Sequence, residues 1–376
     1  MRLQEFNVGV GAFLIIYHIF VLVSLPIYLY FYTPSLSMIA AAIILLYLSG
    51  MSITGGYHRL YSHKAFKAHP IVEFLVLFFG SMAGQGSALR WSFEHRLHHA
   101  HVDTDEDPYS IKKGFWYAHF LWLLQKPKPL DKKIVADLYR NKFVMFQDKH
   151  SVLLMIVTNA IAVLFVGWLL NDYMGAFFIA LWARFLLLHH FTWFINSLAH
   201  TWGDKPFCQE QTAVDNFILA MLTFGEGYHN YHHTFANDYR NGIRWYHFDP
   251  TKWAIWLFSK LGLAYDLKVM DPSTIKKRMV TERKSLLLDK LKTVCSHKKD
   301  EIEVKINEMS ERMIQNISQF NQLKAKYWEF KKNCAEKPQI MQLKQEIRRL
   351  KKDLRSDWRK WKQLSNIILR GKIPQS

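Results

Sequence analysis

Four long apolar stretches limit the folds open to this 376-residue chain more than any other feature. They lie at roughly residues 10–32, 37–57, 152–170 and 175–199. About 20 apolar residues are needed to cross a bilayer as a helix, and in lipid the backbone polar groups must pair within their own segment. We therefore expect an all-α integral membrane protein with four transmembrane helices.

A fifth apolar run, residues 71–89, is a weaker candidate for a span. It contains Glu73, and it is interrupted by Gly80, Gly84 and Gly86. Charged groups inside a span are costly, and glycine is a poor helix former. We expect this run to form a helix that lies in the membrane interface or is buried beneath the rest of the protein.

The distribution of basic residues predicts the orientation of the spans. The connections at residues 33–36 and 171–174 contain no Lys or Arg, whereas the segment 58–150 and the C-terminal tail contain many. Loops rich in Lys and Arg stay on the cytoplasmic side of a membrane. We therefore expect the middle segment, both termini and any site built on them to be cytoplasmic.

Charge also divides the chain into two parts. Residues 273–376 hold 27 Lys and Arg against 12 Asp and Glu, which is +15 of the net charge of +18. We expect a membrane domain over residues 1–270 and a basic helical, coiled-coil-like extension over residues 271–376. The cytoplasmic cap of the membrane domain would comprise residues 58–150 and 200–270.

Nine of the 18 histidines fall into four compact groups. Each group lies at or just beyond the expected cytoplasmic surface, so segments that are distant in sequence meet at one level. Within GEGYHNYHH the spacing i, i+3, i+4 puts three histidines on one helix face, which alone would fit a single zinc site. The grouped residues are His58 and His63 in HRLYSH, His95, His98 and His99 in HRLHH, His200 in NSLAH, and His229, His232 and His233 in GEGYHNYHH.

Nine imidazoles exceed the needs of one ion, whereas two ions with four or five ligands each would use them all. Imidazole suits Fe, Zn, Cu and Ni, so the spacing alone does not choose the metal. A thiolate-free cluster beside a lipid-facing core favours oxygen chemistry at iron. The three cysteines, Cys208, Cys295 and Cys334, are scattered and form no CxxC.

The other nine histidines are expected to have structural or supporting roles, because a lone histidine near a membrane is usually a hydrogen-bonded structural residue. Those expected to be structural are His18, His69, His119, His150 and His297. Those nearer the grouped histidines, expected to be structural or to support the ligands, are His101, His189, His190 and His247.

The segments HRLYSH, EHRLHHAHVDTDEDP, NSLAHTWG and GEGYHNYHHTFANDYR resemble the histidine boxes of membrane-bound fatty acyl desaturases. Their order and flanking residues are most similar to the stearoyl-CoA (delta-9) acyl-CoA desaturase branch. The resemblance covers roughly residues 10–268 and leaves out the basic extension. It implies an oxidoreductase that uses O2 to introduce a cis double bond into a saturated acyl chain.

The resemblance also implies roles for individual residues. The nine grouped histidines match the ligands of two iron ions (Fe2+). Asn196, four residues before His200, matches an asparagine that holds a metal-bound water. Asp103, Asp107 and Glu226 are then expected to accept hydrogen bonds from the ligating imidazoles.

A bent tunnel for the acyl chain, lying beneath the metals, is a further implication of the resemblance. Trp91, Thr192 and Trp193 match positions near the bend of that tunnel. Its far end is expected on the second span around Ala42 and Leu46, where side-chain size would limit the chain length.

The acyl carrier is less well defined by the sequence. Family members grip coenzyme A phosphates with basic side chains, and Lys126 and Lys128 in QKPKP match part of that entrance. Acyl-CoA is favoured, while acyl carrier protein and phospholipid-bound chains stay open. The departures from the animal enzymes are Phe93-Glu94 in place of an Arg-Asp pair, with Arg90 nearby, and Gly86 in place of an asparagine.

The chain shows no HPGG haem motif and no GxGxxG dinucleotide fingerprint. We therefore expect no haem or flavin, and a separate electron donor of the ferredoxin or cytochrome b type. Two other functions stay open. A related membrane hydroxylase would use the same centre to make an alcohol, and a metal transporter or sensor would place its ligands along a path within the spans.

The basic extension has its own pattern. Apolar side chains recur at alternating steps of four and three from Ile302 to Phe330, with Asn316 as the one polar member, and the pattern restarts after Pro338. Two amphipathic helices separated by a proline break are predicted, as a hairpin, a coiled coil or a membrane-surface arm. Their charge favours anionic lipid or an acidic electron donor, self-association is a further option, and nucleic acid is not expected.

Overall fold

A computed structural model describes residues 6–293, 298–333 and 336–370. Of the residues discussed above, Cys295, His297 and Cys334 lie outside the described part of the chain. The chain divides into two compact units. One comprises Met1–Lys205 and Glu210–Val269, and the other comprises Pro206–Gln209 and Met270–Ser376.

Four helices of the first unit are long and apolar enough to cross a membrane, which confirms the predicted number of spans in the described residues. Helix α1 (Val8–Phe31) is the first, and α7 (Ser151–Leu170) is the third. Large apolar side chains on these two helices point outward: Ile16 is 66 % exposed and Trp168 is 69 % exposed. Outward-facing apolar surface of this kind is expected of helices whose solvent is lipid.

The second and fourth spans each change their helical pitch along their length. Helix α2 (Leu36–Met51) runs directly into the π-helical segment η2 (Ser52–Ser62). The fourth span combines α8 (Tyr173–Gly175), the π-helical η6 (Ala176–Ala183), α9 (Arg184–Asn196) and the 3-10 turn η7 (Leu198–His200). Such π-helical turns are rare and occur mostly at functional sites.

The fifth apolar run does not form one helix. Helix α3 (Pro70–Met82) has 13 residues, too few to cross a bilayer, and α4 (Ala88–His101) follows it. Between them Gly84 and Gly86 adopt φ values of +66° and +79°, which favour glycine. Helix α4 packs beside η2, since Arg96 donates hydrogen bonds to the carbonyl oxygens of Ser62 and Tyr61 at 3.0 and 2.6 Å.

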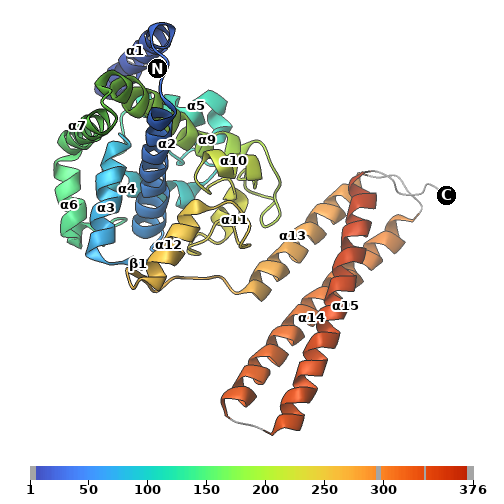
Figure 1. The fold of residues 1–376 in the computed structure, drawn as a ribbon. Helices are drawn as coiled ribbons and strands as arrows, with labels where there is room; N and C mark the ends of the chain where they lie inside the picture. The colour runs from blue at the N-terminus through green and yellow to red at the C-terminus, as the bar shows by residue number, and fades with distance from the viewer. Residues whose placement is uncertain (1–5, 294–297, 334–335, 371–376) are drawn as a thin grey trace. The chain divides into compact units, whose positions relative to one another are not determined.

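The remaining elements of this unit form a cap of short helices and loops over one end of the spans (Figure 1). Before α7 lie η3 (Ile111–Lys113), α5 (Phe115–His119), η4 (Leu121–Leu124), η5 (Leu138–Arg140) and α6 (Lys142–Lys149). After the fourth span come α10 (Phe217–Leu222), α11 (His229–Thr234) and α12 (Pro250–Lys260). Strands β1 (Lys67–Ala68) and β2 (Ala264–Tyr265) pair antiparallel, which ties the end of the cap to the segment after η2.

The described residues of the second unit form a bundle of three helices. They are α13 (Pro272–Lys292), α14 (Lys299–Lys332) and α15 (Lys337–Leu369). The two repeats recognised in the sequence correspond to α14 and α15, and Pro338 lies in the first turn of α15, where its missing N–H costs nothing. The polar Asn316 lies beside Asp357 of α15, to which its side chain donates a hydrogen bond of 3.2 Å.

Candidate metal centre

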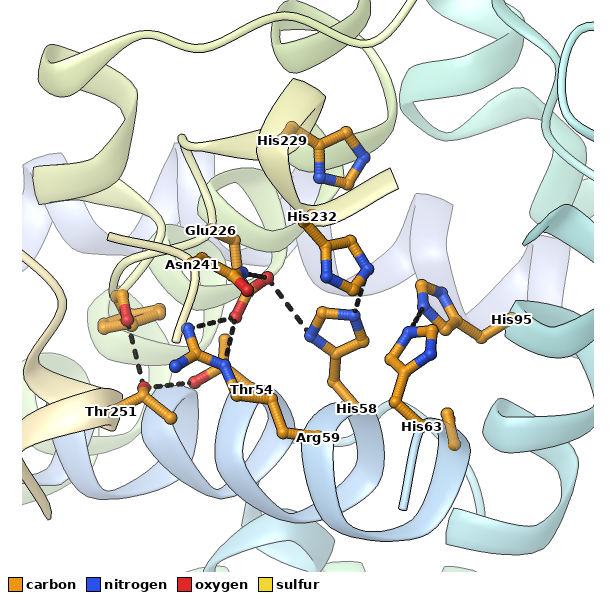
Figure 2. Close-up of polar contacts among 12 residues, drawn as sticks. Thr54, His58, Arg59, His63, His95, Glu226, His229, His232, Asn241 and Thr251 are labelled. Atoms are coloured by element: carbon orange, nitrogen blue, oxygen red, sulfur yellow. Dashed lines mark hydrogen bonds and ion pairs between the residues drawn. The ribbon is translucent and has the colours of Figure 1, made fainter. Parts of the chain in front are cut away.

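Five of the nine grouped histidines converge on one point. One ligand nitrogen from each lies within 4.8 Å of the corresponding atoms of the others. Segment η2 positions His58, and α4 presents His95 and His99 one helical turn apart on the same face. Figure 2 shows part of this convergence. The five residues are His58, His63, His95, His99 and His232.

The Nε2 atoms make the closest approaches within this group. His63 and His95 are 2.8 Å apart at Nε2, and His232 lies 3.0 Å from both His58 and His99. Five imidazole nitrogens gathered at one point, with no acidic or thiol group among them, form the donor set that a transition metal ion takes in proteins.

The other four histidines form a second group of the same kind. It brings together His98 of α4, His200 at the end of the fourth span, and His229 and His233 of α11. Their Nε2 atoms lie 3.0–3.3 Å apart where they approach each other. The three histidines of GEGYHNYHH are therefore divided, because His232 belongs to the first group and the other two to the second.

Hydrogen bonds on the outer nitrogens orient several of these rings. Glu226 Oε2 lies 3.1 Å from His58 Nδ1, and Asp107 Oδ1 lies 2.9 Å from His98 Nδ1. A carboxylate at Nδ1 fixes the tautomer that leaves Nε2 free as a ligand. Each of these two carboxylates thus lies against a ring of one of the two histidine groups.

Asp103 reaches its histidine through an intermediary rather than directly. Thr212 Oγ1 lies 2.7 Å from His200 Nδ1, and it donates a hydrogen bond of 2.5 Å to Asp103. The sequence analysis missed Thr212. It also missed Tyr109, whose hydroxyl lies 3.2 Å from His95 Nδ1. The sequence carries no signal for Thr212, which lies between the third and fourth histidine groups, whereas Tyr109 follows Asp107 by two residues.

A buried ionic network supports Glu226. The guanidinium of Arg59 donates to Glu226 Oε1 at 2.9 Å and to Asp249 Oδ2 at 3.1 Å, and both carboxylates are almost completely buried. Burial alone would raise the pKa of Glu226, but its interactions with His58 and with the guanidinium of Arg59 outweigh burial and lower that pKa. The carboxylate therefore stays ionised beside His58.

Burial also decides the charge of the histidines. It lowers the pKa of His63, His95 and His99 well below the usual value, and neighbouring histidines lower it further. The same holds for His232 and His233 of α11. Rings that stay neutral keep a lone pair for a metal, so both groups fit metal ions held by nitrogen ligands.

A cavity of about 830 Å³ runs beside the two groups. His58, His95, His98 and His229 form part of its wall, as do Trp91, Thr192, Trp193 and Asn196. Deeper in the unit the wall is apolar, with Leu14, Ile53 and Met155. Cavities of this size and character hold small ligands with long apolar portions.

The placement of Ala42 and Leu46 differs from the expectation. Both are buried in α2, but neither belongs to the wall of this cavity. Ala42 packs in a cluster with Met38, Val166 and Ala176, and Leu46 lies in the main core cluster. The helix face that carries them is occupied by other helices, so the deep wall is formed by residues such as Ile53 and Met155 instead.

Basic side chains surround the other end of the cavity. Lys126 and Lys128 both line it, together with Arg90, which donates a hydrogen bond of 2.6 Å to the carbonyl oxygen of Lys128. Arg90 also pairs with Glu94 at 2.7 Å. This end of the cavity could therefore receive the anionic portion of an amphipathic ligand.

A hydrogen bond that the sequence analysis missed crosses the middle of the cavity wall. Gln85 Nε2 donates to Thr192 Oγ1 at 2.7 Å and ties the turn between α3 and α4 to α9. Both residues line the cavity close to Trp193.

The described residues thus combine four apolar helices of spanning length with two all-histidine groups beside one cavity. The sequence profile described as Fatty acid desaturase matches residues 34–267, and the chain belongs to this family. Three relatives with curated names agree with the assignment.

The chain is 44 % identical over 273 residues to a probable acyl-CoA desaturase of Schizosaccharomyces pombe, covering 72 % of this chain and 57 % of that protein. It is 44 % identical over 236 residues to acyl-CoA desaturase 1 of Saccharomyces cerevisiae, covering 62 % and 46 %. An sn-2 palmitoyl-lipid 9-desaturase of Nostoc is 40 % identical over 215 residues, covering 56 % and 73 %. The chain thus spans about half the length of the first two relatives.

Proposed function

We propose that this protein desaturates a saturated fatty acyl chain, using O2 and two iron ions held by the nine histidines. The observation that carries the proposal is the division of those histidines into a group of five and a group of four beside a cavity of about 830 Å³. The expected product is a cis double bond of the delta-9 type.

Each histidine group would hold one iron, and the two ions would activate O2, which is the oxidant for removal of hydrogen from unactivated methylenes. The chain's own residues would orient the metal ligands and keep water away from the reacting carbons. Glu226, Asp107 and Thr212 hold the ligand rings, and the apolar wall excludes water from the reacting carbons. Asn196, on the cavity wall at the end of α9, is the proposed holder of a metal-bound water.

The cavity favours an acyl thioester of coenzyme A as substrate. The basic end with Arg90, Lys126 and Lys128 suits phosphate groups, and two relatives are named acyl-CoA desaturases. The bend of the acyl chain would lie at Trp91, Thr192 and Trp193. The Nostoc relative is named for a lipid-bound chain, so a phospholipid substrate is the alternative carrier.

Two electrons must come from outside the described part of this chain. We propose a separate ferredoxin-like or cytochrome b-type donor that reaches the metal centre from the cytoplasm, where the positive loops place both termini and the site. The basic extension, residues 271–376, is proposed as a contact region for anionic lipid or for an acidic donor.

A related lipid hydroxylase is the second candidate, because the same centre and cavity would serve it. A metal transporter is disfavoured, since the candidate metal ligands among the described residues form two compact groups and not a series of sites along a path.

Expression in a host that lacks its own desaturase, followed by fatty-acid analysis with location of the double bond, tests the proposal. We expect a cis monounsaturated product that requires iron and disappears in His229→Ala. The control His150→Gln, at a histidine whose ring contacts Phe146 outside both groups, should retain full activity. An alcohol would instead support the hydroxylase, and saturated lipids alone, with iron and donor supplied, would refute both enzymes.

A further inference from the structure

Helices α14 and α15 extend beyond the three-helix core of the second unit. The members of that core end at Ile317 on α14 and begin at Leu354 on α15. The start of α13 lies beside Asn321, whose Nδ2 donates a hydrogen bond of 3.0 Å to Ser273 Oγ. From there α14 and α15 continue as a pair past the start of α13 (Figure 1). This end of the pair, residues 320–351, is the distal hairpin.

The distal hairpin is strongly basic. Its sequence holds nine Lys and Arg against three Glu, a net charge of +6. A hollow of about 340 Å³ is lined by residues of both its helices. Lys324 of α14 and Lys344, Arg348 and Lys351 of α15 form part of the wall, and no acidic side chain does. None of these four cations is among the ion pairs described in the second unit, so their charge is available to an external anion.

Aromatic and aliphatic side chains complete the wall of the hollow. They are Phe320, Tyr327 and Trp328 of α14 and Ile347 of α15. Trp328 is 54 % exposed, and Lys331 Nζ lies 5.1 Å from the centre of its ring. Exposed aromatic rings mixed with long basic side chains are typical of surfaces at the level of lipid headgroups. A lysine there lays its aliphatic stem along apolar groups while its ammonium group reaches a phosphate.

We propose that the distal hairpin docks on the anionic phospholipid surface of a membrane, with lipid phosphates in the hollow. Three of the four cations in its wall are lysines. Lysine is depleted in protein–protein interfaces, whereas clusters of it are usual at anionic lipid surfaces. A second copy of the hairpin would bring together two charges of +6, which repel each other.

The membrane domain favours the same partner. Its four apolar helices keep the chain in a bilayer, so lipid headgroups are present at a high effective concentration. The inference rests on the contact region proposed above for residues 271–376, and it narrows that region to one surface and one partner. It requires no catalytic activity.

The strength of the contact follows from the number of charges. Each Lys or Arg close to an anionic bilayer strengthens binding about fivefold, so removal of two of them should weaken it about 25-fold. Lys324→Gln/Lys344→Gln removes one exposed charge of the hollow from each helix. Lys276→Gln/Lys290→Gln is the matched control, because it removes two exposed charges from α13, outside the hollow.

The test is co-flotation of the full-length protein with lipid vesicles. The protein is held in nanodiscs of neutral phosphatidylcholine, which leave the distal hairpin free to bind vesicles that contain about 30 % phosphatidylserine. We expect the wild type to float with these vesicles and not with vesicles of phosphatidylcholine alone. The hollow variant should bind about 25-fold more weakly, whereas the α13 control should stay within about twofold of the wild type.

Equal loss of binding in the two double variants would overturn the inference, because net charge and not the hollow would then be responsible. Equal binding of the wild type to neutral vesicles would overturn it as well. A hollow variant that binds vesicles like the wild type but is poorly driven by the electron donor would assign the hairpin to an acidic protein. A dimer that only the hollow variant lacks would assign it to a second copy.

Failure here can be distinguished from failure of the functions proposed above. If deletion of residues 271–376 abolishes vesicle binding while the hollow variant retains it, the wider contact region stands and the hollow does not. If the protein floats as expected but makes no double bond, the proposed desaturation fails and the lipid contact stands.

Discussion

Replacement of Glu226 by glutamine should weaken one metal site and leave the other intact. Both oxygens of this buried carboxylate accept hydrogen bonds from two donors each. Oε1 accepts from Nε and Nη2 of Arg59 at 3.3 and 2.9 Å, and Oε2 accepts from His58 Nδ1 at 3.1 Å and Asn241 Nδ2 at 2.5 Å (Figure 2). A glutamine NH2 at either place therefore faces two donors.

The magnitude follows from the bonds that are lost. A hydrogen bond to a charged group contributes about 1.5–3 kcal/mol, so two lost bonds cost about 3–6 kcal/mol. Asp249 still pairs with Arg59 at 3.0 Å, so the buried guanidinium keeps a partner of opposite charge. The loss of stability should therefore lie near the lower end of that range. Loss of a residue that orients a ligand typically lowers metal affinity by about 10–100-fold.

The assay is the metal content per chain after dialysis against increasing chelator, together with the thermal unfolding temperature. We expect Glu226→Gln to lose one of two irons at about 10–100-fold lower chelator concentration, with a clear fall in unfolding temperature. Asp266→Asn is a matched control, because Asp266 pairs with Lys67 in full exposure at 2.7 Å and should change neither quantity. Retention of both irons at wild-type chelator concentrations would refute the role assigned to Glu226.

Four further changes test other parts of the structure. Asp107→Asn should weaken iron binding less than Glu226→Gln, because its side-chain oxygen can still accept from His98 Nδ1; metal titration would show this. Gln85→Leu removes the bond to Thr192 and should spread the position of the double bond, seen by mass spectrometry of the products. Leu46→Ala should cost about 2–5 kcal/mol of stability but leave the product chain length unchanged, since Leu46 is buried away from the cavity. Asp357→Asn should cost about 1 kcal/mol of stability, seen as a small fall in the unfolding temperature, because the pair with the half-exposed Arg312 loses its charge.

The chain shares its membrane region with the two yeast relatives but covers only about half their length. The matched region ends close to the boundary between the two units, at residue 267, and the basic three-helix bundle follows it. The proposed external electron donor can be tested by supplying and varying it in activity assays, and deletion of residues 271–376 would show whether the bundle contributes to that exchange.

Sequence periodicity predicted two of the three helices described in the second unit. Helices α14 and α15 were predicted because their apolar residues recur at steps of three and four. Helix α13 was not, since its buried residues Ile275, Val280, Leu287 and Leu291 are spaced irregularly and only contact with the other two helices defines its inner face. The fifth apolar run was likewise predicted as one helix, whereas two glycines with positive φ divide it.

The sequence by itself determined the number of spans, because the length of an apolar run sets whether a helix can cross a bilayer. It also determined which histidines gather, since all four groups follow or end a span at one level. Local spacing could not determine how the histidines divide between the two groups. The spacing i, i+3, i+4 places three rings of GEGYHNYHH on one helix face, but it does not say which other histidines each ring contacts. Only the packing of α11 against η2 and α4 decided that His232 joins His58 while His229 and His233 join His98. The same packing placed Thr212 between Asp103 and His200, a contact between segments more than a hundred residues apart that depends on how the whole cap folds.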